Sequence, residues 1–172
     1  MKKLHVVLLL GLYVAGMFWS RDVMGQQGAV PSAATDKDRC AVCGMFVAKY
    51  PEWVAQIELS DGKVFMFDGP KDMLVFYFSP EEYGAQGGSV NHMHVKDYYS
   101  QHWLDGRKAL YVIGSDVLGP MGEEFVPFDS RQAAETFLKD HHGKAIVSLE
   151  DISPDLVHSM RKGHKMKMKM KQ

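Results

Sequence analysis

Two thiols and a thioether lie within six residues of this chain. The stretch "CAVCGMF" (residues 40–46) contains both cysteines of the protein, Cys40 and Cys43, and Met45 comes two residues after the second one. Thiolates and thioethers are soft donors that select Cu(I) over zinc or calcium. On an extended strand, residues two apart point to the same side, so Cys43 and Met45 could reach one ion. The pattern therefore favours a Cu(I) site.

Three other uses of the cysteine pair stay open. A disulfide would suit an exported protein, but it would close a very small loop and constrain the unfolded chain little. A thioredoxin-like exchange site lies at the start of a helix that follows a strand, whereas this pair follows a polar linker and precedes a strand. A structural zinc site needs about four ligands, and the sequence has no second cysteine pair.

Methionine is abundant, with twelve residues in a chain of 172. Met66 and Met73 fall in apolar segments, where we expect them in the core. Met121 lies between glycines in "GPMGEE", where a core position would be unusual. Met160 and the three methionines of "KMKMKMK" belong to a segment that looks too polar to pack.

The elements that must position these residues begin with a hairpin. Asp61 and Gly62 separate two alternating apolar runs, which is a strong hairpin signal, and Pro70 then opens a short helix. Asp68 and Asp129 precede helices and are expected to be N-caps rather than acid–base groups, with Ser130 as the alternative cap at the second helix. The later elements are expected to be strands over residues 107–115 and 123–130, followed by a helix over residues 130–143. A strand over residues 144–152 and a brief turn of helix from Pro154 complete the expected order.

Two segments of the chain look alike. Residues 64–77 and 125–138 both place Phe-Asp at the end of a strand and an aromatic residue nine positions after that Phe. Each stands at the same point in a strand–strand–helix order. We therefore predict an α+β fold of two small ββαβ units. The alternative is one α+β domain with two similar helix entries.

The N-terminus resembles an export signal, because Lys2 and Lys3 precede an apolar run over residues 4–19. That run falls short of the roughly 20 residues that span a bilayer, so a retained anchor is the second alternative. No cysteine follows the run closely, which gives no support to a lipid anchor. The predicted division begins with an export signal or N-terminal anchor over residues 1–25 and a linker over residues 26–39. A first ββα(β) unit with the metal motif follows over residues 40–88. A second ββαβ unit covers residues 89–160, and a basic Met/Lys tail covers residues 161–172.

The charge is divided along the chain. Residues 26–160 carry eleven basic and twenty acidic side chains, whereas residues 161–172 carry six basic and no acidic ones. The acidic body argues against nucleic acid as a partner. In an extended tail, Met166, Met168 and Met170 would line one side as a weak Cu(I) collector. The lysines could then contact a membrane surface. A solubilising tail without a specific role is the alternative.

From the "CxxCGM" motif onward, the chain resembles the NosL family of copper chaperones. The resemblance covers residues 40–152 and includes "DGKVFMFDGPKDML", "VKDY", "WLDGRKALYVIGS", "GPMGEEFVPF" and "AAETFLKDHHGK". It implies two ββαβ units with a shape related to organomercurial lyase, in agreement with the internal repeat.

The resemblance also implies a ligand set. Cys43 and Met45 fall on the family's Cys-Gly-Met, and Met121 falls on the methionine of its Met-Gly loop, which many members continue with histidine. Here that position is Glu123, a hard oxygen ligand that suits Cu(I) poorly. An all-sulfur site needs no further ligand, and Cys40 could add a second thiolate or act as a resolving thiol. Otherwise the last ligand is Glu123, or His92 or His94 in its place.

The function implied by the resemblance is that of an exported, non-enzymatic Cu(I) chaperone in the periplasm or cell envelope. It would deliver copper to nitrous oxide reductase through a membrane ABC-type assembly complex. The alternatives are a periplasmic thiol-disulfide oxidoreductase and a general copper storage or buffering protein. A carbon–mercury lyase would need additional reactive cysteines that the chain lacks.

Overall fold

The computed structural model describes residues 31–169 of the chain, with side chains through residue 162. The expected export signal or anchor and Met170 lie outside this range. Within it, none of the helices combines the length and the apolar character needed to cross a membrane. The described part of the linker leads into the body, where the Ser32 backbone N–H donates a hydrogen bond to Oε1 of Gln56 at 3.2 Å.

The first sheet has four antiparallel strands in the order β2-β1-β3-β4. Their bounds are Ala55–Leu59 for β1, Val64–Phe67 for β2, Val90–Lys96 for β3 and Trp103–Asp105 for β4. The predicted hairpin is confirmed, because β1 and β2 pair around Gly62, whose φ of +82° is the left-handed conformation that such turns favour. Helix α1 (Pro70–Phe78) follows with Pro70 in its first turn.

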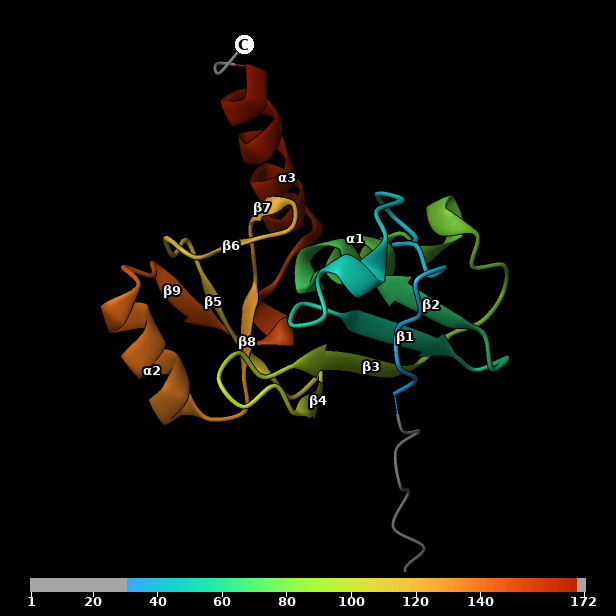
Figure 1. The fold of residues 1–172 in the computed structure, drawn as a ribbon, viewed down its shortest axis with the longest axis horizontal. Coiled ribbons are helices and arrows are strands. Elements are labelled where there is room, and N and C mark those ends of the chain that lie inside the picture. The colour runs from blue at the N-terminus through green and yellow to red at the C-terminus, as the bar shows by residue number, and fades with distance from the viewer. Residues whose placement is uncertain (1–30, 170–172) are drawn as a thin grey trace, which may run out of the picture.

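The second sheet repeats this order of connections. It contains β5 (Leu110–Ile113), β8 (Val126–Phe128) and β9 (Ala145–Val147), and α2 (Arg131–Asp140) joins the last two strands. The spatial order is β8-β5-β9, just as β2-β1-β3 is the order in the first unit. The predicted α+β fold of two ββαβ units is confirmed, and Figure 1 shows the two sheets with their helices.

The first sheet extends further along the chain than the first unit was predicted to extend. Strand β3 pairs with β1, placing His94 opposite Gln56, and β4 pairs with β3. Residues up to Asp105 therefore belong to the first sheet, although the division assigned residues from 89 onward to the second unit. The Gly-rich stretch of residues 84–89 suggested a boundary between units. It is the connection from α1 to the third strand of the same unit.

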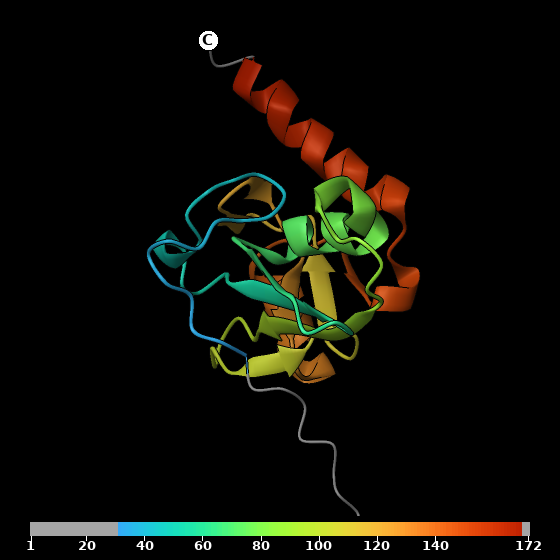
Figure 2. The same cartoon turned by 90° about the vertical axis from the view of Figure 1, so that its right-hand side faces the viewer.

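A small β-ribbon and a long C-terminal helix complete the fold. Strands β6 (Leu118–Gly119) and β7 (Gly122–Glu123) form the ribbon, and α3 spans Pro154–Lys169. Short 3-10 helices lie at Val47–Lys49 (η1), Pro80–Tyr83 (η2) and Leu149–Asp151 (η3). Beyond the body, α3 projects away from both sheets (Figures 1 and 2).

Helix α3 contradicts the expected brief turn of helix and the extended tail. Lysine and methionine are both good helix formers, which explains why the helix continues into the Met/Lys segment. At 3.6 residues per turn, residues two apart lie roughly 200° apart around the axis. The extended backbone on which the predicted alignment of the tail methionines depends is therefore not present in residues 163–169. Met160, expected in an unpacked tail, is buried in the core.

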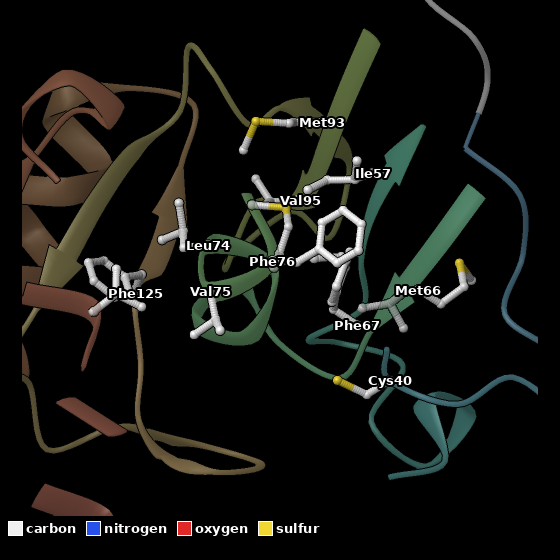
Figure 3. Packing of buried hydrophobic residues seen from close by; sticks show 14 of the residues in the cluster. Cys40, Ile57, Met66, Phe67, Leu74, Val75, Phe76, Met93, Val95 and Phe125 are labelled. Carbon is white, nitrogen blue, oxygen red and sulfur yellow. The ribbon is translucent and has the colours of Figure 1, made fainter. Parts of the chain in front are cut away.

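The main core lies between the first sheet and α1. Alternate residues of the strands, including Ile57, Phe67 and Met93, point to the helix and are completely or almost completely buried (Figure 3). Phe76 of α1 packs its ring 5.3 Å from that of Phe67. The same cluster includes Tyr111 of β5 and thus continues into the second unit. Met66 and Met73 are both buried, as predicted.

Candidate metal centre

The cysteines lie on a tight turn that is attached to the edge of the first sheet. The Cys40 N–H donates to the Met45 carbonyl at 2.8 Å, and the Gly44 N–H donates to the Cys40 carbonyl at 2.9 Å. The Ala41 N–H donates to the carbonyl of Met66 at 3.0 Å, which holds the turn against β2. Gly44 has a φ of +78°, so the chain reverses there. The expected extended geometry of Cys43 and Met45 is therefore wrong.

Both thiols face the start of α1. The Cys40 Sγ donates to Asp72 Oδ2, and the Cys43 Sγ donates to Asp68 Oδ2, each at 3.4 Å. One ligand atom from each of these four side chains lies within 4.8 Å of the others. Within the described part of the chain, no second group of three or more His, Cys, Asp or Glu side chains approaches this closely. The turn, the end of β2 and the first turn of α1 thus converge on one point.

Asp68 and Asp72 were not predicted as site residues. Asp68 was expected to cap α1, but the N-cap position is Gly69, and no side chain caps that end. At α2 the cap is Ser130, which accepts from the Ala133 N–H at 3.2 Å, so Asp129 is not a cap either. The available signal was a pair of aspartates four residues apart around a helix start, a spacing that brings side chains together.

The carboxylates are unusually deeply buried. Asp68 is 1% exposed and Asp72 is 2% exposed. Arg161 of α3 reaches Asp72 with its Nε 3.9 Å from Oδ1. The Oδ1 atom of Asp68 is buried without a hydrogen-bond partner among the residues described. Burying such an oxygen is costly unless something binds it, so the cluster has the character of a cation site.

The protonation of the cluster supports the same interpretation. Hydrogen bonding with Cys43, burial, and the charges of Asp68 and Asp72 raise the pKa of the Cys40 thiol far above its ordinary value. Burial is the main cause that raises the pKa of Asp68, and the neighbouring Asp72 adds to it. Since like charges cannot all be ionised at this distance, protons occupy the cluster in the absence of a cation. A bound metal ion would replace them.

The remaining predicted ligands lie on the cysteine turn and on the β6–β7 ribbon. Met45 is half-buried in the same turn as the cysteines. Met121 is half-buried in the turn between β6 and β7, and its carbonyl accepts a hydrogen bond from Lys71 Nζ at 2.7 Å. The carbonyl of Glu123 in β7 accepts a second bond from the same ammonium group. Because Lys71 is adjacent to Asp72, the Met121 turn lies against the helix end that supplies the carboxylates.

The two histidines lie elsewhere on the sheet. His94 is opposite Gln56, which is opposite Met66, and the cysteine turn is beyond Met66. With strands about 4.8 Å apart, three such steps separate His94 from the turn by roughly 14 Å. The rings of His92 and His94 instead stack on each other, with centroids 5.8 Å apart. Neither histidine is placed to complete the site.

The surroundings of the cysteines differ from those of a thiol-disulfide exchange site. The turn is followed by the three-residue helix η1 and not by the N-terminus of an α-helix. Cys40 is 2% exposed, and its pKa is raised, whereas reactive thiols have lowered pKa values. Both cysteines are free thiols. The environment suits metal binding better than attack on a disulfide.

Known proteins resemble this chain in sequence and in fold. A copper-binding lipoprotein NosL from Stutzerimonas stutzeri is 29% identical over 136 residues, covering 77% of this chain and 70% of that protein. A copper-binding lipoprotein NosL from Achromobacter cycloclastes is 28% identical over 144 residues, covering 76% of this chain and 72% of that one.

The crystal structure of the copper chaperone NosL from Shewanella denitrificans has the same fold, with a TM-score of 0.64 at 24% identity. The match covers 73% of this chain and 97% of that one. The NosL family model matches residues 31–157, a range that contains both ββαβ units and the cysteine turn. The chain belongs to the NosL family.

Proposed function

We propose that this protein is an exported, non-enzymatic Cu(I) chaperone that supplies copper for the assembly of nitrous oxide reductase. The observation that carries the proposal is the convergence of two thiols and two buried carboxylates within 4.8 Å. The names of the relatives, copper-binding lipoprotein and copper chaperone, support copper as the cargo.

In this proposal Cu(I) is held by sulfur. Cys43, Met45 and Met121 supply the soft donors, and Cys40 adds a second thiolate. The carboxylates of Asp68 and Asp72 are hard donors, better suited to orient the thiols and balance the positive charge than to bind Cu(I) directly. Glu123 is the one oxygen ligand in the predicted set, and its carboxylate is likewise a hard donor that suits Cu(I) poorly.

The unequal burial of the two thiols suggests the order of transfer. Cys43 is partly exposed, whereas Cys40 is buried. An acceptor ligand can approach the ion from the Cys43 side while Cys40 still holds it. Exchange then proceeds one ligand at a time, so the ion is never free in solution. Such a transfer needs neither a catalytic base nor a nucleophile.

Location and partners complete the proposal. We propose that residues 1–25 direct the chain to the periplasm or cell envelope, either as a cleaved signal or as an anchor. Both relatives are named lipoproteins, whereas both cysteines of this chain lie in the metal motif. The acceptors would be nitrous oxide reductase and its membrane ABC-type assembly complex.

An anaerobic competition titration tests the site. We expect the reduced protein to bind one Cu(I) per chain and more tightly than it binds Zn(II). Cys43→Ser should weaken binding by more than the roughly 10–100-fold that follows loss of a residue supporting a ligand. Met121→Leu should also weaken binding, while Met66→Leu serves as a matched control at a buried methionine outside the ligand set.

Three results would contradict this proposal. One-equivalent binding that survives both Cys43→Ser and Met121→Leu would exclude the proposed ligands. Tighter binding of Zn(II) than of Cu(I) would exclude the proposed cargo, since two thiols and two carboxylates could also form a four-coordinate zinc site. A stoichiometry well above one ion per chain would favour copper storage.

The acceptor needs its own experiment. The Cu(I)-loaded protein would be mixed with copper-free nitrous oxide reductase in membranes that contain the ABC-type complex, and copper in the reductase would be measured. We expect transfer that depends on Cys43. Equal metallation by a Cu(I)-chelator complex of the same affinity would contradict a dedicated delivery role.

A further inference from the structure

Two ionisable side chains beside the metal centre are buried although neither is one of the predicted ligands. Lys71 in the first turn of α1 is 1% exposed, and Glu124, just after β7, is 3% exposed. Taking such groups out of water is costly, and apolar residues of similar volume are often at least as stabilising. Their presence therefore calls for a reason other than stability.

Their hydrogen bonds connect the same two segments in both directions. The Nζ of Lys71 donates to the backbone carbonyls of Met121 and Glu123, which belong to the β6–β7 ribbon. The Oε1 of Glu124 accepts the backbone N–H of Lys71 in return, and also the N–H of Phe125 at 3.0 Å. Each side chain thus binds the backbone of the other segment.

Two glycines make room for this connection. A Cβ atom at Gly69 would lie 2.6 Å from Oε2 of Glu124, and one at Gly119 would lie 2.8 Å from the same oxygen. Both distances are too short for any residue with a side chain unless the carboxyl group moves. The helix start and the ribbon are therefore shaped around the Glu124 carboxyl group.

We propose that Lys71 and Glu124 are positioning residues that hold the β6–β7 turn against the start of α1, so that Met121 reaches the Cys40–Cys43 cluster. The inference rests on the proposed function. The thiols and aspartates come from the first unit, whereas Met121 arrives from a segment about fifty residues later. A ligand on a two-stranded ribbon needs such a connection to keep a fixed distance to the rest of the site.

A double-mutant cycle on Cu(I) affinity tests whether Lys71 acts through Met121. Lys71→Leu removes the ammonium donors and adds no sulfur atom near the site. We expect it to weaken Cu(I) binding by about 10–100-fold, similarly to Met121→Leu, and the double variant should be no weaker than either single one. X-ray absorption of the Cu(I) form should show one sulfur neighbour fewer in each variant. Lys63→Leu, at an exposed lysine of the hairpin, is the matched control.

Two outcomes would overturn the inference. The first is wild-type affinity with an unchanged number of sulfur neighbours in Lys71→Leu. The second is independent losses of affinity that multiply in the double variant. If Lys71→Leu does not fold, Gly119→Ala provides the same test, because its methyl group displaces the Glu124 carboxyl group. A folded Gly119→Ala protein that keeps all its sulfur neighbours would also overturn the inference.

The results are separable from failure of the proposed function. If Cys43→Ser leaves Cu(I) binding intact, the proposed site itself is wrong. If Cys43→Ser abolishes binding while Lys71→Leu changes nothing, the site stands and the positioning role of Lys71 is wrong.

Discussion

Each cysteine of the metal motif has a carboxylate of its own. The Cys40 thiol donates to Asp72 and the Cys43 thiol donates to Asp68, so a metal ion that binds the thiols must displace their protons. The raised pKa of Cys40 means that this thiol is protonated throughout the neutral range. Metal binding and proton release are therefore coupled at these residues.

The coupling predicts a pH dependence of copper affinity. As pH rises, fewer protons compete with Cu(I) for the thiols, so affinity should increase by up to roughly tenfold per pH unit for each proton released. Anaerobic competition titrations from weakly acidic to weakly alkaline pH measure the slope. Cys40→Ser should make the slope shallower, because it removes a thiol that must lose its proton when the metal binds. A pH-independent affinity would contradict the assignment of Cys40 as a ligand.

Glu124 predicts a pH dependence of stability. Burial raises its pKa from 4.5 to about 8 in the folded protein. Between these values the unfolded chain is ionised while the folded one keeps its proton, so the contribution is fully present below pH 4.5 and is lost as pH rises to about 8. The free energy of unfolding should fall by at most about 1.4 kcal/mol per pH unit in that window.

Denaturant unfolding across this pH range checks the prediction. Glu124→Gln, which cannot ionise, should flatten the profile between pH 4.5 and about 8. Asp61→Asn, at an exposed turn, serves as the control. The pKa of Asp61 is lowered, mainly by a hydrogen bond from the Lys63 backbone N–H, so Asp61 stays ionised across this pH range. A Glu124→Gln profile that keeps the full slope would show that another group is responsible.

At the scale of elements, the two helix starts use their aspartates differently. Ser130 caps α2 by accepting from the Ala133 N–H, while the exposed Asp129 precedes the cap. At α1 the cap is a glycine, and Asp68 turns toward Cys43. The start of α1 thus has no side-chain cap, and its aspartate contributes a carboxylate to the metal centre.

The cap at α2 predicts an effect of substitution on stability and none on metal binding. Ser130→Ala should lower the free energy of unfolding by about 1 kcal/mol, as expected for a lost N-cap, and leave Cu(I) affinity unchanged. Asp129→Ala is the matched control with little effect on either quantity. Denaturant unfolding and the Cu(I) competition assay measure the two. A larger loss in Asp129→Ala than in Ser130→Ala would contradict the cap assignment.

At the scale of the whole molecule, the C-terminal helix both joins the units and extends beyond them. Val157 and Met160 of α3 are buried in the core that also contains Phe67 and Phe125, and Arg161 contacts Asp72 of the metal centre. The part of α3 after residue 162 carries the Met/Lys segment. The first part of the helix is structural, and we propose membrane contact as the role of the Met/Lys segment.

Truncation after residue 162 separates these roles. The truncated chain keeps Met160 and Arg161, so it should retain wild-type stability and one-equivalent Cu(I) affinity. Loss of the lysines should weaken binding to vesicles that contain anionic lipid, by about 1 kcal/mol for each basic residue near the surface. Co-sedimentation with anionic and neutral vesicles measures this. Equal sedimentation of both chains would argue against the membrane contact.

The sequence alone determined what depends on neighbours along the chain. The Asp61-Gly62 hairpin, the helix opened by Pro70, the repeated strand–strand–helix order and the family motifs were all readable from local spacing. Such features are set by backbone preferences and by the period of apolar residues, which act within about ten positions.

Only the tertiary structure decided which distant side chains meet. It brought Asp68 and Asp72 to the thiols, left His92 and His94 in the sheet, and buried Met160. Local patterns could not decide this, because a polar residue before a helix can cap it or turn inward. The choice depends on whether a partner more than twenty residues away is packed there to receive it.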